Sequence, residues 1–111
     1  MRYLLLIGGP DIGLSSKDIC DSEESKAWIA DLEARGVLRG GELLRPVSDA
    51  TTVRVRDGEV LLADGPFAET KEQIGGLNVI ECADLDEALE IAARHPAAKY
   101  GMVEVRPIWE T

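Results

Sequence analysis

The segment LADGPFAETKEQIGG, residues 62–76, concentrates the side chains of this chain that could bind or transform a small molecule. It combines an Asp-Gly-Pro turn, a lone phenylalanine and several charges within one short connection between two strand-like stretches. Binding residues occur disproportionately on loops, and a rigid loop that carries an aromatic ring beside opposite charges resembles a pocket wall. The candidate ligand contacts in this loop are Gly65, Pro66, Phe67, Glu69 and Lys71.

The same segment also admits a purely structural interpretation. Asp64 could act as a general base if it is buried, although an aspartate that accepts backbone hydrogen bonds in a turn is the commoner case. Thr70 and Gln73 fit a capping box for a short helix over residues 71–74, and Gly75-Gly76 would let the chain reverse into the next strand. Both interpretations stay open at this point, with Asp64 as a candidate catalytic residue.

His95 is the second candidate catalytic residue, because the single histidine of the chain could titrate near neutral pH. It lies at the end of a predicted helix and before Pro96, where a favourable contact with the helix dipole is the commoner role. Ser25 is a further candidate ligand contact. It shares a helix face with Trp28, so its hydroxyl is expected to point inward and to bond the preceding turn. One histidine without a cluster of cysteines or carboxylates makes no metal site, so we expect no metal and no cofactor.

The charge and composition of the chain argue against several classes of partner. Its 111 residues are 45% hydrophobic and 30% charged, which is typical of a single globular domain over residues 1–111. The net charge of −9 argues against nucleic acid and against anionic membrane surfaces, because both attract clustered lysine and arginine. The N-terminal apolar run is too short for a signal sequence, and we expect a cytoplasmic protein.

A β-hairpin is the clearest local structure that the sequence predicts. In TTVRVRDGEVLLAD, residues 51–64, the Asp57-Gly58 pair suits a two-residue type I′ turn, in which both residues need positive φ. This turn fixes the register of the hairpin, which places Arg56 opposite Glu59, Val55 opposite Val60 and Val53 opposite Leu62.

Strands and helices alternate on either side of this hairpin. We expect a strand over residues 2–8, a helix from the N-cap Asp21 to Gly36, and a short strand over residues 37–44. After the hairpin come a strand over residues 77–83, a helix that Asp84 caps and His95-Pro96 ends, and a last strand over residues 100–109.

This order predicts an α+β, ferredoxin-like fold, which is a doubled βαβ unit with an inserted β-hairpin. Its mainly antiparallel sheet would carry both helices on one face. The other face then has no cover within the chain, and an exposed apolar sheet face favours a second subunit. We therefore expect a homodimer.

The stretch DGPFAETKEQIGG, preceded by TTVRVRDG and followed by ADLDEALEIAARHPAAKYGMVEVRP, closely resembles the DGPF-motif subgroup of the YCII-related family. The resemblance extends from Arg2 almost to the end of the chain, and the loop over residues 9–20 departs from it. It implies a ferredoxin-like fold, a dimeric α/β-barrel-like assembly with the two sheets face to face, and a small-molecule cleft near the interface.

The family resemblance leaves three classes of function open. YCII-like proteins include proposed lyase-type enzymes, in which a histidine on the first helix pairs with an aspartate near the end of the second. Those positions fall near Ser25 and on His95, so the pair cannot be carried over. The chain is then an acid–base enzyme that uses Asp64, Glu69, Lys71 or His95, a non-catalytic ligand-binding or regulatory accessory module linked to alternative sigma factors, or a purely structural dimer.

Overall fold

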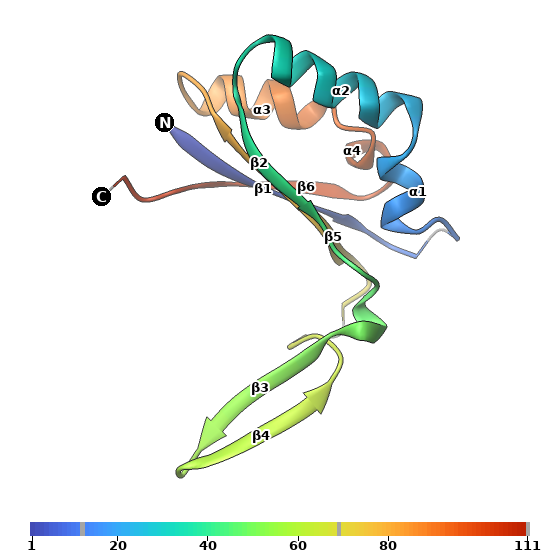
Figure 1. Ribbon diagram of the computed structural model, residues 1–111, viewed down its shortest axis with the longest axis vertical. Helices are drawn as coiled ribbons and strands as arrows, with labels where there is room; N and C mark the ends of the chain where they lie inside the picture. Colours follow the sequence, from blue (N-terminus) through green and yellow to red (C-terminus); the bar gives the residue numbers. More distant parts are fainter. Residues whose placement is uncertain (12, 69, 111) are drawn as a thin grey trace.

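A four-stranded antiparallel sheet with helices on one face forms the body of the protein, and a two-stranded hairpin projects from it (Figure 1). The computed structural model describes residues 1–11, 13–68 and 70–110. The strand order in the main sheet is β2-β5-β1-β6. The elements are β1 (Arg2–Gly9), α1 (Ser16–Cys20), α2 (Glu23–Ala34), β2 (Leu38–Leu43), the 3-10 turn η1 (Val47–Asp49), β3 (Thr51–Arg56), β4 (Glu59–Asp64), β5 (Gln73–Glu81), α3 (Leu85–Ala93), α4 (Ala97–Tyr100) and β6 (Met102–Pro107).

This topology confirms an α+β chain with an antiparallel sheet and is compatible with the predicted ferredoxin-like fold. The units β1-α2-β2 and β5-α3-β6 interleave, so that β5 lies between β1 and β2, and β1 lies between β5 and β6. Interleaving of this kind makes every neighbouring pair antiparallel and leaves both crossover helices on the same face. Figure 1 shows α2 and α3 side by side over that face.

The core fills the space between the sheet and these two helices. Alternate residues of β1 point into it, and Tyr3 and Leu5 are almost completely buried together with Ile80 of β5. From the helices, Trp28 and Ile91 meet them, and the Trp28 indole N–H donates a 2.9 Å hydrogen bond to the carbonyl oxygen of Ile91. This bond satisfies the one polar group that the tryptophan buries and ties α2 to α3.

The first helical segment differs from the prediction. Asp21 does not cap the long helix, because its backbone is helical (φ −80°, ψ −4°) and it closes the short helix α1, which the sequence indicated as loop. An N-cap needs an extended backbone, and Ser22 has one (φ −67°, ψ 153°) and accepts the amide of Ser25. The predicted end is confirmed: Gly36 has the positive φ of 71° that closes α2.

The helix predicted over residues 71–74 is wrong. Gln73 begins β5 and pairs with Gly9 of β1, while Gln73 Nε2 donates to the carbonyl of Thr70. Thr70 donates its hydroxyl to the carbonyl of Glu72, which closes a local turn. The backbone of Gln73 thus pairs within the sheet, so it is not available for the hydrogen bonds of a helical turn.

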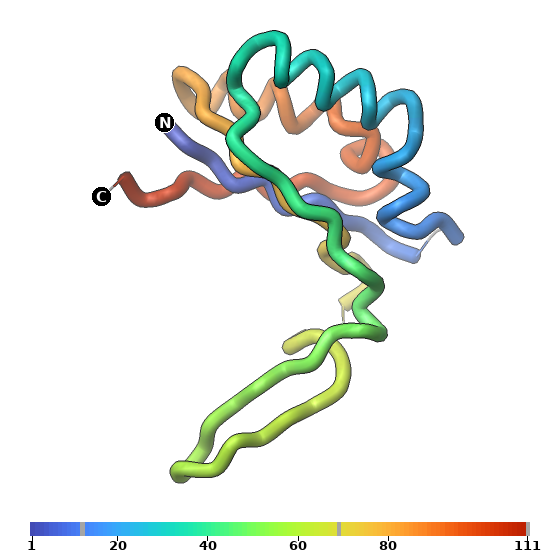
Figure 2. The backbone as a smooth tube through the Cα atoms, in the orientation of Figure 1, coloured from blue at the N-terminus to red at the C-terminus, as the bar shows by residue number. Residues whose placement is uncertain are grey.

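The predicted hairpin register is confirmed at each position. Arg56 opposes Glu59, Val55 opposes Val60 and Val53 opposes Leu62. Both turn residues have positive φ, 52° at Asp57 and 79° at Gly58, as a type I′ turn requires. We call the hairpin of residues 51–64 the arm, because Figure 2 shows its backbone extending away from the body.

Glycines let the backbone close at one end of the sheet, and one of them offers a test of the fold. An added Cβ at Gly101 would lie 2.3 Å from the carbonyl oxygen of Gly8, whereas one at Gly40 would meet no atom within 4 Å. We expect Gly101→Ala to lower the free energy of unfolding by about 1–3 kcal/mol. Gly40→Ala, the matched control, should change it by less than about 0.5 kcal/mol. Urea unfolding of both variants measures this, and equal stabilities would contradict the close approach.

Candidate functional site

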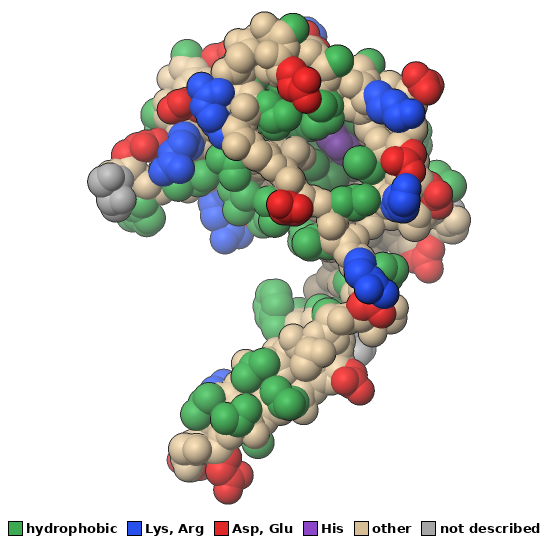
Figure 3. All heavy atoms as spheres, viewed as in Figure 1, with side chains coloured by type: hydrophobic (Ala, Val, Ile, Leu, Met, Phe, Trp, Pro, Cys, Tyr) green, Lys and Arg blue, Asp and Glu red, His purple; other side chains and the backbone are tan. Residues whose placement is uncertain are grey.

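A cavity of about 880 Å³ lies between the sheet and the helices α1 and α2. Figure 3 shows the hollow on one face of the body, with the purple side chain of His95 inside it among hydrophobic side chains. Its walls are mainly apolar and include Trp28 and Ile29 of α2, Ile19 of α1, and Leu38 of β2. A concave, largely apolar site with few polar groups is the usual form of a small-molecule site.

Pairs of glycines on three adjacent strands form the floor of this cavity. Gly8-Gly9 of β1, Gly40-Gly41 of β2 and Gly75-Gly76 of β5 all line it. Gly76 opposes Ile7, whose side chain points toward the helices, so the missing side chain leaves space on that face. The sequence predicts a chain reversal at the third pair. It does not reveal that the sheet order brings all three pairs together.

The side chain of Asn78 lies over this floor. A Cβ added to Gly41 would lie 2.3 Å from Asn78 Nδ2, so the amide lies directly over the glycine. Among the described residues, no hydrogen bond of this amide is recorded, and Asn78 lines the cavity. Sequence reasoning could not find Asn78, because a polar residue within the stretch LNVIECA has no distinguishing pattern.

His95 contributes a buried polar ring to the cavity. The residue is only 7% exposed, and its Nδ1 accepts a 3.0 Å hydrogen bond from the backbone N–H of Ala97. Its ring packs edge-on against Trp28, with 4.7 Å between ring centroids. Burial lowers the pKa of His95 from 6.5 to about 4, so the imidazole is neutral at pH 7.

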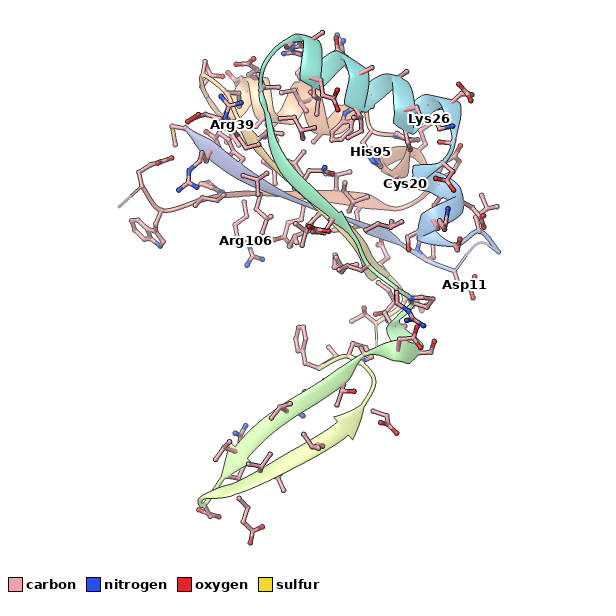
Figure 4. The ribbon with its side chains drawn as sticks, viewed as in Figure 1. Asp11, Cys20, Lys26, Arg39, His95 and Arg106 are labelled. Atoms are coloured by element: carbon pink, nitrogen blue, oxygen red, sulfur yellow. The ribbon has the colours of Figure 1, made fainter. Side chains whose placement is uncertain are left out.

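The hydrogen bond at Nδ1 determines what His95 can do. With Nδ1 as acceptor, the proton of the neutral ring lies on Nε2, which becomes a donor. Among the described residues, the only fully hidden side-chain nitrogen or oxygen atom without a hydrogen bond is Glu104 Oε2, which forms an ion pair with Arg106 instead. Nε2 has no hydrogen-bond partner among the described residues and is not fully hidden, and His95 lines the cavity. Figure 4 shows the ring between α2 and the segment that follows α3.

The predicted dipole contact of His95 is therefore wrong in its physical basis. A favourable interaction with a helix C-terminus requires a charged imidazolium, and burial removes that charge. The ring instead accepts an amide proton at the start of α4.

Ser25 lies on the same side of the sheet, and the prediction that it points inward is confirmed. It is buried and lines the cavity together with His95. Its hydroxyl donates a 2.6 Å hydrogen bond to the carbonyl of Ile19 and accepts one from Ser22 Oγ. The proton of Ser25 is thus engaged by the preceding turn, and the side chain is arranged to support α1 rather than to act as a nucleophile.

The loop that carries the DGPF motif lies elsewhere. Gly65 turns the chain with a φ of 96°, and its amide donates a 2.7 Å bond to Ala50. Pro66 and Phe67 line a second cavity of about 730 Å³ beside η1, and Phe67 is 83% exposed. Lys71 is exposed and lines neither cavity. Glu69 lies outside the described residues.

The two candidate catalytic residues are not brought together within one chain. Asp64 is exposed at the end of β4 and does not line the cavity of His95. The carboxylate of Asp64 therefore cannot act as a general base on a molecule bound in that cavity, because a base must reach the proton that it takes. The described residues contain no group of three or more His, Cys, Asp or Glu side chains that could hold a metal ion. None of the helices described is long and apolar enough to cross a membrane.

The protein belongs to the α+β class, with an antiparallel sheet, helices on one face of it and a cavity between these two layers. Within that class, the chain belongs to the YCII-related family, because the YCII-related domain matches residues 1–111. It is also 43% identical over 95 residues to "Uncharacterized protein R00369" of Rhizobium meliloti (strain 1021). That match covers 78% of this chain and 77% of the relative. The family resemblance inferred from the sequence is thus confirmed, and the DGPF-motif subgroup stays a prediction.

The neutral state of His95 predicts a specific dependence of stability on pH. Between pH 6.5 and about 4 the unfolded chain binds a proton at this residue that the native chain does not, so stability falls as the pH falls through this range. A shift of this size corresponds to roughly 3 kcal/mol. Between pH 7 and pH 4, wild type should lose roughly that much more unfolding free energy than His95→Gln, as measured by urea unfolding. Equal losses in the two chains would show that His95 is not buried as a neutral ring.

Proposed function

We propose that this protein binds a small, mainly apolar and uncharged molecule in the cavity, and that His95 Nε2 donates a hydrogen bond to a carbonyl oxygen of that molecule. The observation that carries the proposal is the neutral, buried imidazole whose Nδ1 is already occupied by Ala97. A hydrogen bond made away from water discriminates strongly, because a ligand without the acceptor leaves the buried donor unpaired.

The charges around the cavity favour an uncharged ligand. Two arginines line it, but Arg39 lies 3.4 Å from the carboxylate of Glu81, and Arg45 lies 3.0 Å from that of Asp49. The lining carboxylates, Asp11 and Glu42, are both exposed. An anionic ligand would therefore find no unpaired cation among the described lining residues, and a carbonyl compound fits the site better than a carboxylate.

Lyase-type chemistry is the second candidate, since the same donor would polarise a bound carbonyl and weaken the adjacent C–H bond. Such a reaction also needs a base within reach of that proton. Among the described lining residues, only the exposed carboxylates and the exposed thiol of Cys20 are available for this role. Binding without turnover is thus the better supported function, and a regulatory accessory role linked to sigma factors remains a prediction within it.

A ligand screen by thermal shift tests the binding proposal. The panel contains cyclic ketones, esters and amides, each beside a carboxylate of the same size, with wild type and the variants His95→Phe and His95→Gln. Neutral compounds should raise the melting temperature, because ligands stabilise the state that they bind. His95→Phe should weaken binding roughly fivefold to tenfold, since one hydrogen bond contributes about 1 kcal/mol. His95→Gln keeps a donor and should lose less.

The loop variants Asp64→Asn and Lys71→Met provide the controls of this screen. Both positions lie outside the cavity of His95, so each variant should bind a hit as wild type does. If these loop variants lost binding while His95→Phe kept it, the site would belong to the DGPF loop instead.

We also propose that two copies associate through the sheet face that the helices leave open. Leu4 and Leu6 of β1 lie there beside Leu77 and Val79 of β5, and cross-strand pairing places the four side chains together. Their partial burial within one chain leaves an apolar surface that a second sheet would cover.

Sedimentation at micromolar concentration should give a dimer for wild type. Leu6→Glu places a charge on the open face and should weaken the dimer at least tenfold, since an unpaired charge there loses its water. Leu89→Glu makes the same change on the exposed surface of α3 and should leave the dimer intact. A monomeric wild type would contradict the assembly.

A further inference from the structure

The arm carries an apolar face that has no partner in its own chain. Val53, Val55, Val60 and Leu62 form two directly opposed cross-strand pairs on one face, and they are between 57% and 69% exposed. Figure 3 shows hydrophobic side chains gathered along this part of the arm. Side chains alternate between the faces of a strand, so the face behind carries Arg54, Arg56, Glu59 and Leu61 instead.

The arm is anchored at its base and makes few contacts beyond it. Thr52 Oγ1 donates a 2.8 Å bond to the carbonyl of Gly65, and the amide of Gly65 bonds Ala50. Beyond this base, β3 and β4 contact mainly each other, and the ribbon runs clear of the body (Figure 1). A two-stranded hairpin by itself is marginally stable in water, so the arm needs a surface on which to pack.

The open sheet face and the arm border the same concave side of the molecule. Arg106 points from the sheet away from the helices, toward the side on which the arm projects (Figure 4). A single partner seated there would cover both apolar surfaces at once.

The size of an interface supports a second copy of this chain as that partner. Four strands about 4.8 Å apart and six to nine residues long give a face of roughly 450 Å², and the two six-residue strands of the arm add roughly 200 Å². Stable interfaces bury about 800 Å² per partner, so the sheet face alone falls short and the arm brings the total closer.

The arginines of the arm allow this contact without the burial of charge. Arg54 and Arg56 lie on the face opposite the apolar pairs, so packing the apolar face on a partner leaves both guanidinium groups facing away from the contact.

We propose that the arm packs against the body of a second copy of this chain, with Val53, Val55, Val60 and Leu62 buried on the partner. The proposal rests on the dimer proposed above and adds the arm as a necessary part of its interface. The exchange is reciprocal, so each copy both extends an arm and receives one.

Two neighbouring residues of β4 allow a matched test by sedimentation equilibrium. Val60→Thr keeps the branched side chain but adds a hydroxyl on the apolar face, whereas Leu61→Thr makes a comparable change on the opposite face. Because a symmetric dimer contains each site twice, Val60→Thr should raise the dimer dissociation constant at least tenfold. Leu61→Thr should change it less than threefold. Equal constants for the two variants would overturn the role of the arm.

These variants distinguish failure of the arm proposal from failure of the dimer proposal. If Leu6→Glu dissociates the dimer and Val60→Thr leaves it unchanged, the sheet interface stands and the arm proposal falls. If wild type is a monomer, both fall. Amide hydrogen exchange of residues 51–64 gives an independent readout on unmodified protein. Protection there should rise with protein concentration as the dimer forms, and protection that does not depend on concentration would overturn the proposal.

Discussion

Trp28 is the residue on which the helical layer and the cavity both depend. Its indole N–H bonds the carbonyl of Ile91, which holds α2 beside α3, and its ring supports the edge of His95. A smaller apolar residue at this position would leave a void in the core. It would also remove the hydrogen bond to the Ile91 carbonyl and the ring contact with the imidazole. Packing and polar chemistry are therefore set by the same side chain, which makes the histidine a fixed part of the fold.

The position of His95 shows how burial selects a chemical role. An exposed histidine exchanges protons near neutral pH, whereas this one is held neutral and accepts the amide of Ala97. In the family pattern an aspartate is expected at this position and a histidine on the first helix. The family resemblance inferred from the sequence places His95 near that aspartate position, and Ser25 on the helix has its proton engaged by Ile19. The proposed function accordingly assigns recognition of a carbonyl, rather than proton transfer, to the donor at His95.

Sequence patterns predicted the features that depend on residues close together along the chain. The arm register followed from Asp57-Gly58, the end of α2 from Gly36, and the burial of Trp28 from its helix face. Two predictions were wrong because the same backbone groups could enter another local structure. Ser22 rather than Asp21 caps α2, and Gln73 pairs within the β-sheet instead of entering a helix. The cavity could not be predicted, because it arises from glycine pairs that become neighbours only when the strands order themselves.

The glycines of the cavity floor also differ in what they would tolerate over evolutionary time. Side chains at Gly8, Gly9 and Gly101 would collide with backbone, and one at Gly41 would displace Asn78. Gly40 lines the same cavity but has open space at its Cβ position and no positive φ. Gly40 pairs with Val79, whose side chain lies on the open sheet face, so a side chain at Gly40 would point away from the chamber. The glycines that keep the chamber open are thus the ones at which substitution disturbs the sheet or Asn78, so the scaffold itself constrains ligand size in descendants of this protein.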